Sequence, residues 1–194
     1  MKKKLLLCLV FMLLAGIVFF VKPALENRDS PTLEDLEKSW AEITEKILDK
    51  GIGRVSDNMI FIPFELVAKY KDKLIEIPSD SSEIGWVLFG LTEEGKQMKE
   101  IDIPAYIEGK PVICLYTGAF FRCPDLVSVT IPGTIRYTRN YAFSFCPKLK
   151  SITSSGDFFN AVGGVNSPIF AECNISEWNY SDGLDVEFTF APWE

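Results

Sequence analysis

The chain of 194 residues contains no histidine. Ser-His-Asp and Cys-His catalysis, HExxH zinc sites and histidine pH switches all need an imidazole that titrates near neutrality, so these functions are excluded. Any catalysis would have to use carboxylates, Lys, Tyr or Cys. The sequence also lacks a Cys-x-x-Cys pair, which zinc sites usually supply. We therefore expect no metal site and no cofactor.

Basic residues are too few for a nucleic-acid-binding protein. The chain has 20 Lys and Arg against 27 Asp and Glu, a net charge of −7. Binding to nucleic acid requires a basic surface that displaces counterions from phosphate, so we expect no nucleic-acid partner. Residues 1–24 hold four of the lysines and no acid, which leaves 16 basic and 27 acidic residues, or −11, for the remainder.

The first 24 residues are typical of an export segment. Three lysines at positions 2–4 precede an unbroken apolar run from Leu5 to Val21. Cleavage after Ala24 would put Lys22 where a signal peptidase prefers a small residue, so we favour an uncleaved membrane anchor while a cleaved signal stays open. We expect an extracytoplasmic protein, either associated with the cell envelope or secreted.

A helix is predicted from Ser30, which suits an N-cap, to Gly51, which suits a helix end. Its apolar residues form one stripe, but two heptads are too few for a coiled coil, so we expect the stripe to pack on its own domain. The stripe consists of Leu33, Leu36, Trp40, Ile43 and Ile47. Strands are predicted at Asn58–Ile62 and Gly85–Leu91, with a helix or long strand between Phe64 and Ile77 and a turn at 79–82.

An internal repeat organises the second half of the chain. The segment Ala119–Pro132 aligns without a gap onto Ala142–Thr153, sharing Ala-Phe, Cys-Pro, Leu, Ser and Thr at an offset of 23 residues. A half-unit precedes at Met98–Pro104, and a degenerate one follows at Phe170–Cys173.

Within one unit, the apolar residues Val129 and Ile131 alternate as in a short strand with one buried face. Pro132 ends that strand because it lacks an N–H, and Ile135 with Tyr137 should run along the opposite wall. One such coil cannot bury enough surface to be stable alone, so the coils must stack.

This pattern resembles the BspA-type leucine-rich repeat over about residues 98–175, and Ile103–Val112 is similar to the segment that leads into such arrays. The resemblance implies an exported or surface-attached protein that binds host or matrix proteins or neighbouring cells, and not an enzyme. The chain departs from the family by its few repeats and by Ser154-Ser155 where Ile-Pro is expected.

The cysteines Cys123, Cys146 and Cys173 occupy equivalent or nearly equivalent repeat positions. Strands stacked about 4.8 Å apart would allow a disulfide, so a bridge stays open. The resemblance implies instead a ladder of buried thiols that pack as small apolar groups.

The candidate binding surface is the outward side of the repeat strands, although an ordinary solvated sheet face would have the same composition. Its residues are Lys99, Glu100 and Asp102, then Val127, Ser128 and Thr130, then Lys150, Ser151 and Thr153. The aromatic tail is expected to cap the open end of the stack; it contains Trp178, Tyr180, Phe188, Phe190 and Trp193.

These observations predict an α/β protein with a short leucine-rich-repeat solenoid of about three coils, preceded by a small α/β region and an N-terminal hydrophobic helix. The predicted divisions are 1–24 (signal or anchor), 25–95 (α/β region), 96–175 (repeats) and 176–194 (cap). The predicted function is a protein-binding or adhesion-type module at the cell surface, with membrane contact through the N-terminal segment. The alternatives are a carboxylate-dependent envelope hydrolase with its site in region 31–95, and a purely structural envelope component.

Overall fold

The computed structural model describes residues 33–69, 84–138, 141–155, 157–158, 168–170 and 172–180. The expected N-terminal hydrophobic segment and the turn predicted at 79–82 lie outside these residues. Within the described ranges, no helix combines the length and the apolar character needed to cross a bilayer.

Helix α2 (Leu33–Asp49) ends where the sequence predicts. Gly51 adopts a left-handed φ of 63°, and its N–H donates to the carbonyl of Leu48 at 2.8 Å. The N–H of Ile52 donates to the carbonyl of Ile47 at 3.1 Å, which completes a Schellman cap. The partly buried side chain of Ile52 packs in the same apolar cluster as Ile47, as this motif favours.

A mixed sheet follows α2 and leads directly into the repeats. Its strands are β1 (Arg54–Ser56), β2 (Met59–Pro63), β3 (Trp86–Leu91), β5 (Tyr106–Ile107), β6 (Lys110–Leu115) and β8 (Tyr137–Thr138), with α3 (Phe64–Lys69) after β2 and the short helix η1 (Gly95–Gln97) after β3. Strands β1, β2 and β3 are antiparallel neighbours, whereas β3 pairs with β6, and β6 with β8, in parallel. The predicted strands at Asn58–Ile62 and Gly85–Leu91 are thereby confirmed, and one sheet joins the N-terminal region to the first coil.

The two faces of this sheet bury side chains in different cores. On the outer face, Trp40 and Ile43 of α2 pack with Ile60 and Phe89, and the Trp40 ring stacks on Phe89 at a centroid distance of 4.7 Å. Alternate residues of the same strands, such as Phe61, point into the core of the solenoid. The prediction that the α2 stripe packs on its own domain is confirmed for Trp40, Ile43 and Ile47; the side chains of Leu33 and Leu36 are outside the described set.

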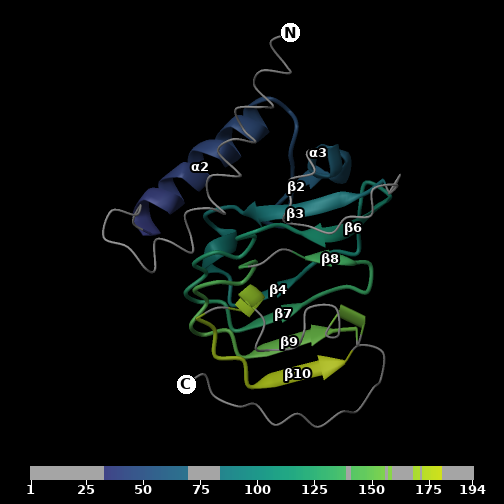
Figure 1. The fold of residues 1–194 in the computed structure, drawn as a ribbon. Coiled ribbons are helices and arrows are strands. Elements are labelled where there is room, and N and C mark those ends of the chain that lie inside the picture. The colour runs from purple at the N-terminus through teal and green to yellow at the C-terminus, as the bar shows by residue number, and fades with distance from the viewer. Residues whose placement is uncertain are drawn as a thin grey trace.

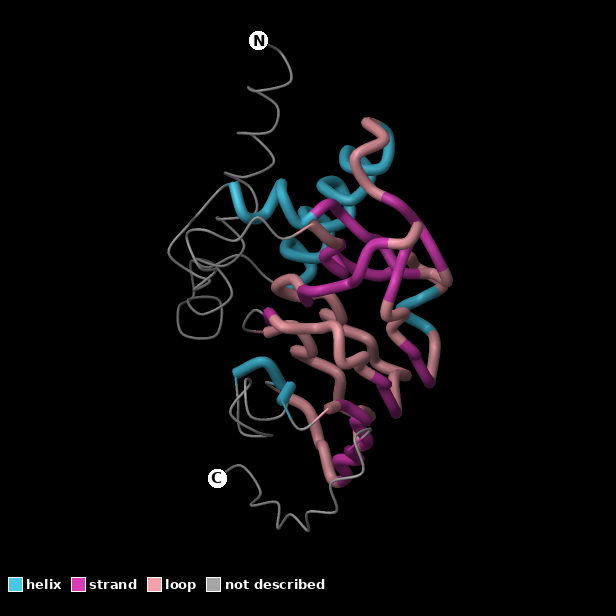
Figure 2. Tube along the Cα trace, turned by 90° about the vertical axis from the view of Figure 1, so that its right-hand side faces the viewer, coloured by secondary structure: helices cyan, strands magenta, loops and turns pink. Residues whose placement is uncertain are grey.

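The repeats form a β-solenoid of about three turns. One wall is a parallel sheet in the order β10, β9, β7, β4, whose strands lie one below the other in Figure 1 and along one side of the molecule in Figure 2. The strands are β4 (Glu100–Asp102), β7 (Ser128–Thr130), β9 (Ser151–Ser154) and β10 (Glu177–Tyr180), and the short helix η2 (Pro168–Phe170) precedes β10. On the opposite wall, β8 contains Tyr137, as predicted. Strand β8 pairs in parallel with β6, and Tyr137 lies beside Cys114, which is 23 residues earlier, the length of one repeat.

Stacked phenylalanine rings fill the solenoid core. Phe120, Phe143 and Phe170 are at most 1% exposed, and each comes from a different coil. The ring centroids of Phe120 and Phe143 lie 4.5 Å apart, and those of Phe143 and Phe170 lie 5.3 Å apart. The repeated Ala-Phe pair of the sequence therefore forms a continuous apolar column, which is the shared core that a single coil lacks.

The turn before each repeated cysteine is left-handed. Arg122, Phe145 and Glu172 precede Cys123, Cys146 and Cys173, and their φ angles are 53°, 61° and 58°. Such angles cost free energy for residues with a Cβ, so they persist here because the stacked coils fix the turn.

Candidate functional site: the outward face of the parallel sheet

The four parallel strands align their outward residues in rows that run from coil to coil. Ile101, Val129, Ile152 and Trp178 stand in one register row and are at most 7% exposed, so this row points into the core. The residues on either side of this row therefore point outward. Two outward rows result: Glu100, Ser128, Ser151, Glu177, and Asp102, Thr130, Thr153, Asn179.

A third row lies where the chain enters these strands. The carbonyl of Lys99 accepts hydrogen bonds from the N–H groups of Val127 and Ser128, at 2.7 and 3.1 Å. The carbonyl of Val127 accepts in the same way from Lys150, and that of Lys150 from Ser176. The backbone of Lys99, Val127, Lys150 and Ser176 therefore continues the register of the two outward rows, and these four residues are exposed. We call the three rows together the strand face, defined as Lys99, Glu100, Asp102, Val127, Ser128, Thr130, Lys150, Ser151, Thr153, Ser176, Glu177 and Asn179.

The strand face is acidic at its edges and rich in hydroxyl groups in the middle. Glu100 and Asp102 of β4 and Glu177 of β10 are exposed, while the Ser and Thr side chains between them are half-buried by their neighbours on adjacent strands. Val127, 36% exposed, lies between Lys99 and Lys150 in the third row, and both lysines are exposed. Such a surface offers hydrogen-bond donors and acceptors at the spacing of parallel strands, about 4.8 Å.

Sequence reasoning missed the strand-face residues of β10. The amide of Asn179 donates a hydrogen bond to Oγ of Ser151 at 3.3 Å, so β10 continues the pattern of the preceding coil. From cysteine to core strand residue the spacing is six in the second unit, from Cys146 to Ile152, but five in the last, from Cys173 to Trp178. An alignment that allowed one deletion would have revealed this strand.

An ion pair joins neighbouring coils beside the strand face. Nζ of Lys148 lies 2.6 Å from Oδ1 of Asp125, its counterpart one repeat earlier. The hydrogen bond and the charge of Lys148, together with the charge of Lys99, hold the pKa of Asp125 below its usual value. Since both side chains are exposed, this pair aligns the coils more than it stabilises them.

The repeated cysteines form a buried ladder of free thiols. Cys123, Cys146 and Cys173 are buried, and no disulfide joins the cysteines of the described residues. Sγ of Cys146 donates to the carbonyl of Phe120 at 3.0 Å, and Sγ of Cys173 donates to that of Phe143 at 2.8 Å. Each thiol thus satisfies a carbonyl of the preceding coil, which a purely apolar side chain could not do.

Their environment makes these thiols resistant to ionisation. Hydrogen bonding with Cys123, followed by burial, raises the pKa of the Cys146 thiol, and hydrogen bonding with Cys146, followed by burial, raises that of Cys173. A buried protonated thiol is a poor nucleophile and a poor metal ligand. Among the residues described, no group of three or more Cys, Asp or Glu could hold a metal ion.

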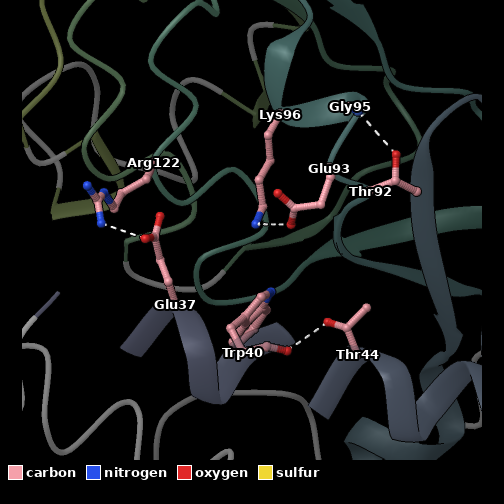
Figure 3. A network of polar contacts seen from close by, with 8 residues as sticks. All are labelled: Glu37, Trp40, Thr44, Thr92, Glu93, Gly95, Lys96 and Arg122. Carbon is pink, nitrogen blue, oxygen red and sulfur yellow. Dashed lines mark hydrogen bonds and ion pairs between the residues drawn. The ribbon is translucent and has the colours of Figure 1, made fainter. Parts of the chain in front are cut away.

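A cavity of about 560 Å³ lies between α2 and the first coil. Glu37 of α2 contacts Arg122 of the coil, with Oε2 2.6 Å from Nη1, and Lys96 contacts Glu93 at 2.8 Å (Figure 3). A hydrolase with its site in region 31–95 would need two acids that face each other, whereas Glu37 and Glu93 each face a cation. Sequence reasoning did not find this cavity, because its walls come from three separate segments.

No curated protein matches this chain. A crystal structure of a leucine-rich-repeat protein from T. pallidum matches at 26% identity with a TM-score of 0.30, over 40% of this chain and 40% of that protein, so the shared part spans less than half of either.

The family model for the BspA type leucine rich repeat region (6 copies) matches residues 68–187, which is more than half of the chain. Leucine-rich repeats of this kind are protein-interaction modules, and their fold is typically a non-enzymatic scaffold. Together with the 23-residue repeat and the stacked coils, this match supports one conclusion. The chain belongs to the BspA-type leucine-rich-repeat family.

Proposed function

We propose that this chain is an exported cell-envelope protein that binds a protein partner through the strand face. The observation that carries the proposal is the register of β4, β7, β9 and β10, which brings outward polar residues from four strands into two continuous rows. Export is supported by the lysines and apolar run of residues 2–21 and by the typical surface location of the family.

The size of the strand face sets the expected strength of binding. Four strands of four residues cover about 19 Å by 13 Å, or roughly 250 Å². A stable interface buries about 800 Å² on each partner, so the strand face would supply about a third of that area. The partner must therefore also contact neighbouring surfaces, or it binds weakly and transiently.

In this proposal the other parts of the chain close the solenoid and hold it at the envelope. Residues 25–95 close the first coil, which is supported by the packing of α2 over the sheet that contains β6. Residues from 176 onward close the last coil, supported by Trp178, whose ring lies edge-on to Phe170 at 5.6 Å. Residues 1–24 supply the membrane contact.

The test is capture of envelope proteins by the full-length chain and by a variant in which Ser128, Thr130, Ser151 and Thr153 are replaced by Glu. When the partner binds, the four new carboxylates would lose their water without gaining partners of opposite charge. Capture of the specific partner should therefore be lost.

A control variant, Lys46→Glu with Lys50→Glu, changes the net charge by the same four units at two exposed positions, one on α2 and one just after it. Capture should persist in this control. Equal capture by the strand-face variant, with its thermal unfolding unchanged, would contradict the proposal.

A further inference from the structure

The cavity between α2 and the first coil has the size and position of a ligand site. Its volume of about 560 Å³ falls within the range of roughly 300–1,000 Å³ found for small-molecule pockets. It lies where the N-terminal region meets the first repeat, and such junctions are common places for ligand sites. Gln97 and Pro124, which line it, precede strands β4 and β7, so the cavity opens beside the strand face and is separate from it.

One wall of the cavity is a single face of α2. Glu34, Glu37, Lys38 and Ala41 line it at helical spacing, which places all four on one side of the helix. Trp40 fixes that side, since its ring stacks on Phe89 with an interplanar angle of 9°. Figure 3 shows Trp40 on the helix beside the two ion pairs. The core therefore fixes which face of α2 is turned toward the cavity.

The opposite wall presents two cations, Arg122 and Lys96, together with the acid Glu93. The Arg122 side chain is 40% exposed and the Lys96 side chain 21% exposed, so both are partly held in place by their surroundings. The ion pair with Glu37 involves one nitrogen of the Arg122 guanidinium, and that with Glu93 one donor of the Lys96 ammonium. A guanidinium has five N–H donors and an ammonium three, so both retain donors for a ligand.

The charges that line the cavity balance. Three acids, Glu34, Glu37 and Glu93, stand against three cations, Lys38, Lys96 and Arg122. The α2 wall carries Glu34, Glu37 and Lys38, a net charge of −1, and the opposite wall carries Glu93, Lys96 and Arg122, a net charge of +1. A ligand with one charge of each sign would match both walls.

We propose that this cavity binds a small zwitterion, either a free amino acid or a short peptide with free ends. Its carboxylate lies on Arg122 and Lys96, and its ammonium group lies on Glu34 and the second carboxylate oxygen of Glu37. The site does not depend on the strand face, so either proposal can fail without the other.

The ligand arm of the test is calorimetric titration of the full-length chain, purified in detergent, at pH 7. The probes are alanine, trialanine, N-acetyl-trialanine, trialanine amide and trialanine blocked at both ends. Trialanine should bind, either single block should weaken binding about tenfold, and the doubly blocked peptide should give no signal. If alanine binds as tightly as trialanine, the natural ligand is a free amino acid. If alanine binds more weakly than trialanine, the natural ligand is a short peptide. Equal binding of free-ended and doubly blocked trialanine, or no heat with any probe, would overturn the proposal.

The protein arm uses Arg122→Gln and Lys96→Gln, with Lys148→Gln as the control. Lys148 forms an ion pair of the same 2.6 Å length as Arg122 but does not line the cavity. Each cavity variant should weaken trialanine binding at least fivefold and leave binding of trialanine amide unchanged, because only the carboxylate contact is lost. The control should bind as the parent does. Lys96 forms its ion pair with Glu93, three residues earlier, and not with α2. Lys96→Gln therefore tests the site even if Arg122→Gln loosens the packing of α2. Unchanged trialanine binding by Lys96→Gln would refute the assignment.

Discussion

The ring of Phe143 lies in the middle of the phenylalanine column, fully buried between Phe120 and Phe170. Replacing a buried Phe by Ala typically costs about 3–5 kcal/mol in stability, through lost burial and the cavity left behind. Because this ring stacks on both sides, Phe143→Ala should fall at the upper end, about 4–5 kcal/mol. A domain of this size has a total stability of about 5–15 kcal/mol, so the variant should lose between about a third and nearly all of it.

The assay is urea unfolding followed by circular dichroism. With a slope of about 2 kcal/mol per molar urea, the midpoint should fall by roughly 2 M. Phe121→Ala is the matched control, since Phe121 is half-buried and contacts Phe145 edge-on at 5.6 Å, outside the column. It should lose about 1–2 kcal/mol. If both variants lost the same small amount, the column would not be the core that joins the coils.

Two further predictions concern the turns and the thiols. Glu172 is exposed and has a φ of 58°, which glycine adopts at a lower free-energy cost, so Glu172→Gly should raise Tm by about 2 °C. Gly118 has a φ of 68°, so Gly118→Ala should lower Tm by a similar amount. A calorimetric scan measures both changes. Because the folded chain raises the pKa of Cys146 and Cys173, their protons are lost more readily from the unfolded chain above about pH 8.5. Stability should therefore fall as the pH rises, with a slope that approaches about 1.4 kcal/mol per pH unit for each thiol. Urea titrations between pH 8.5 and 9.5 check this, and a slope unchanged in the double Ala variant of these cysteines would refute it.

The repeat made part of the fold predictable. An offset of 23 residues, with Leu, Val and Ile at fixed places in each unit, indicated parallel strands, their buried row and the opposite wall at Tyr137. The stop of α2 at Gly51 was predictable because left-handed helix ends favour glycine. The pairing of β3 with β6 was not, because it joins strands about 25 residues apart that belong to no common repeat.

The candidate site divides in the same way. Ser128, Thr130, Ser151 and Thr153 were placed by strand alternation alone. Glu177 and Asn179 were not, because one deletion after Cys173 shifts the last unit out of register. The cavity could not be anticipated, since Glu37 and Arg122 are 85 residues apart and are brought together by the packing of α2 on the sheet.

The central claim is that the strand face contacts a protein partner, and site-specific photocrosslinking in intact cells tests it most directly. A benzophenone amino acid is placed at Thr130 on the strand face or, as the control, at Glu45 on an exposed position of α2. One discrete crosslinked protein is expected from position 130 and none from position 45. The adduct from position 130 should be lost when Ser128→Glu, Ser151→Glu and Thr153→Glu are combined. An adduct from position 45 alone, or from neither position in cells that contain the captured partner, would contradict the central claim.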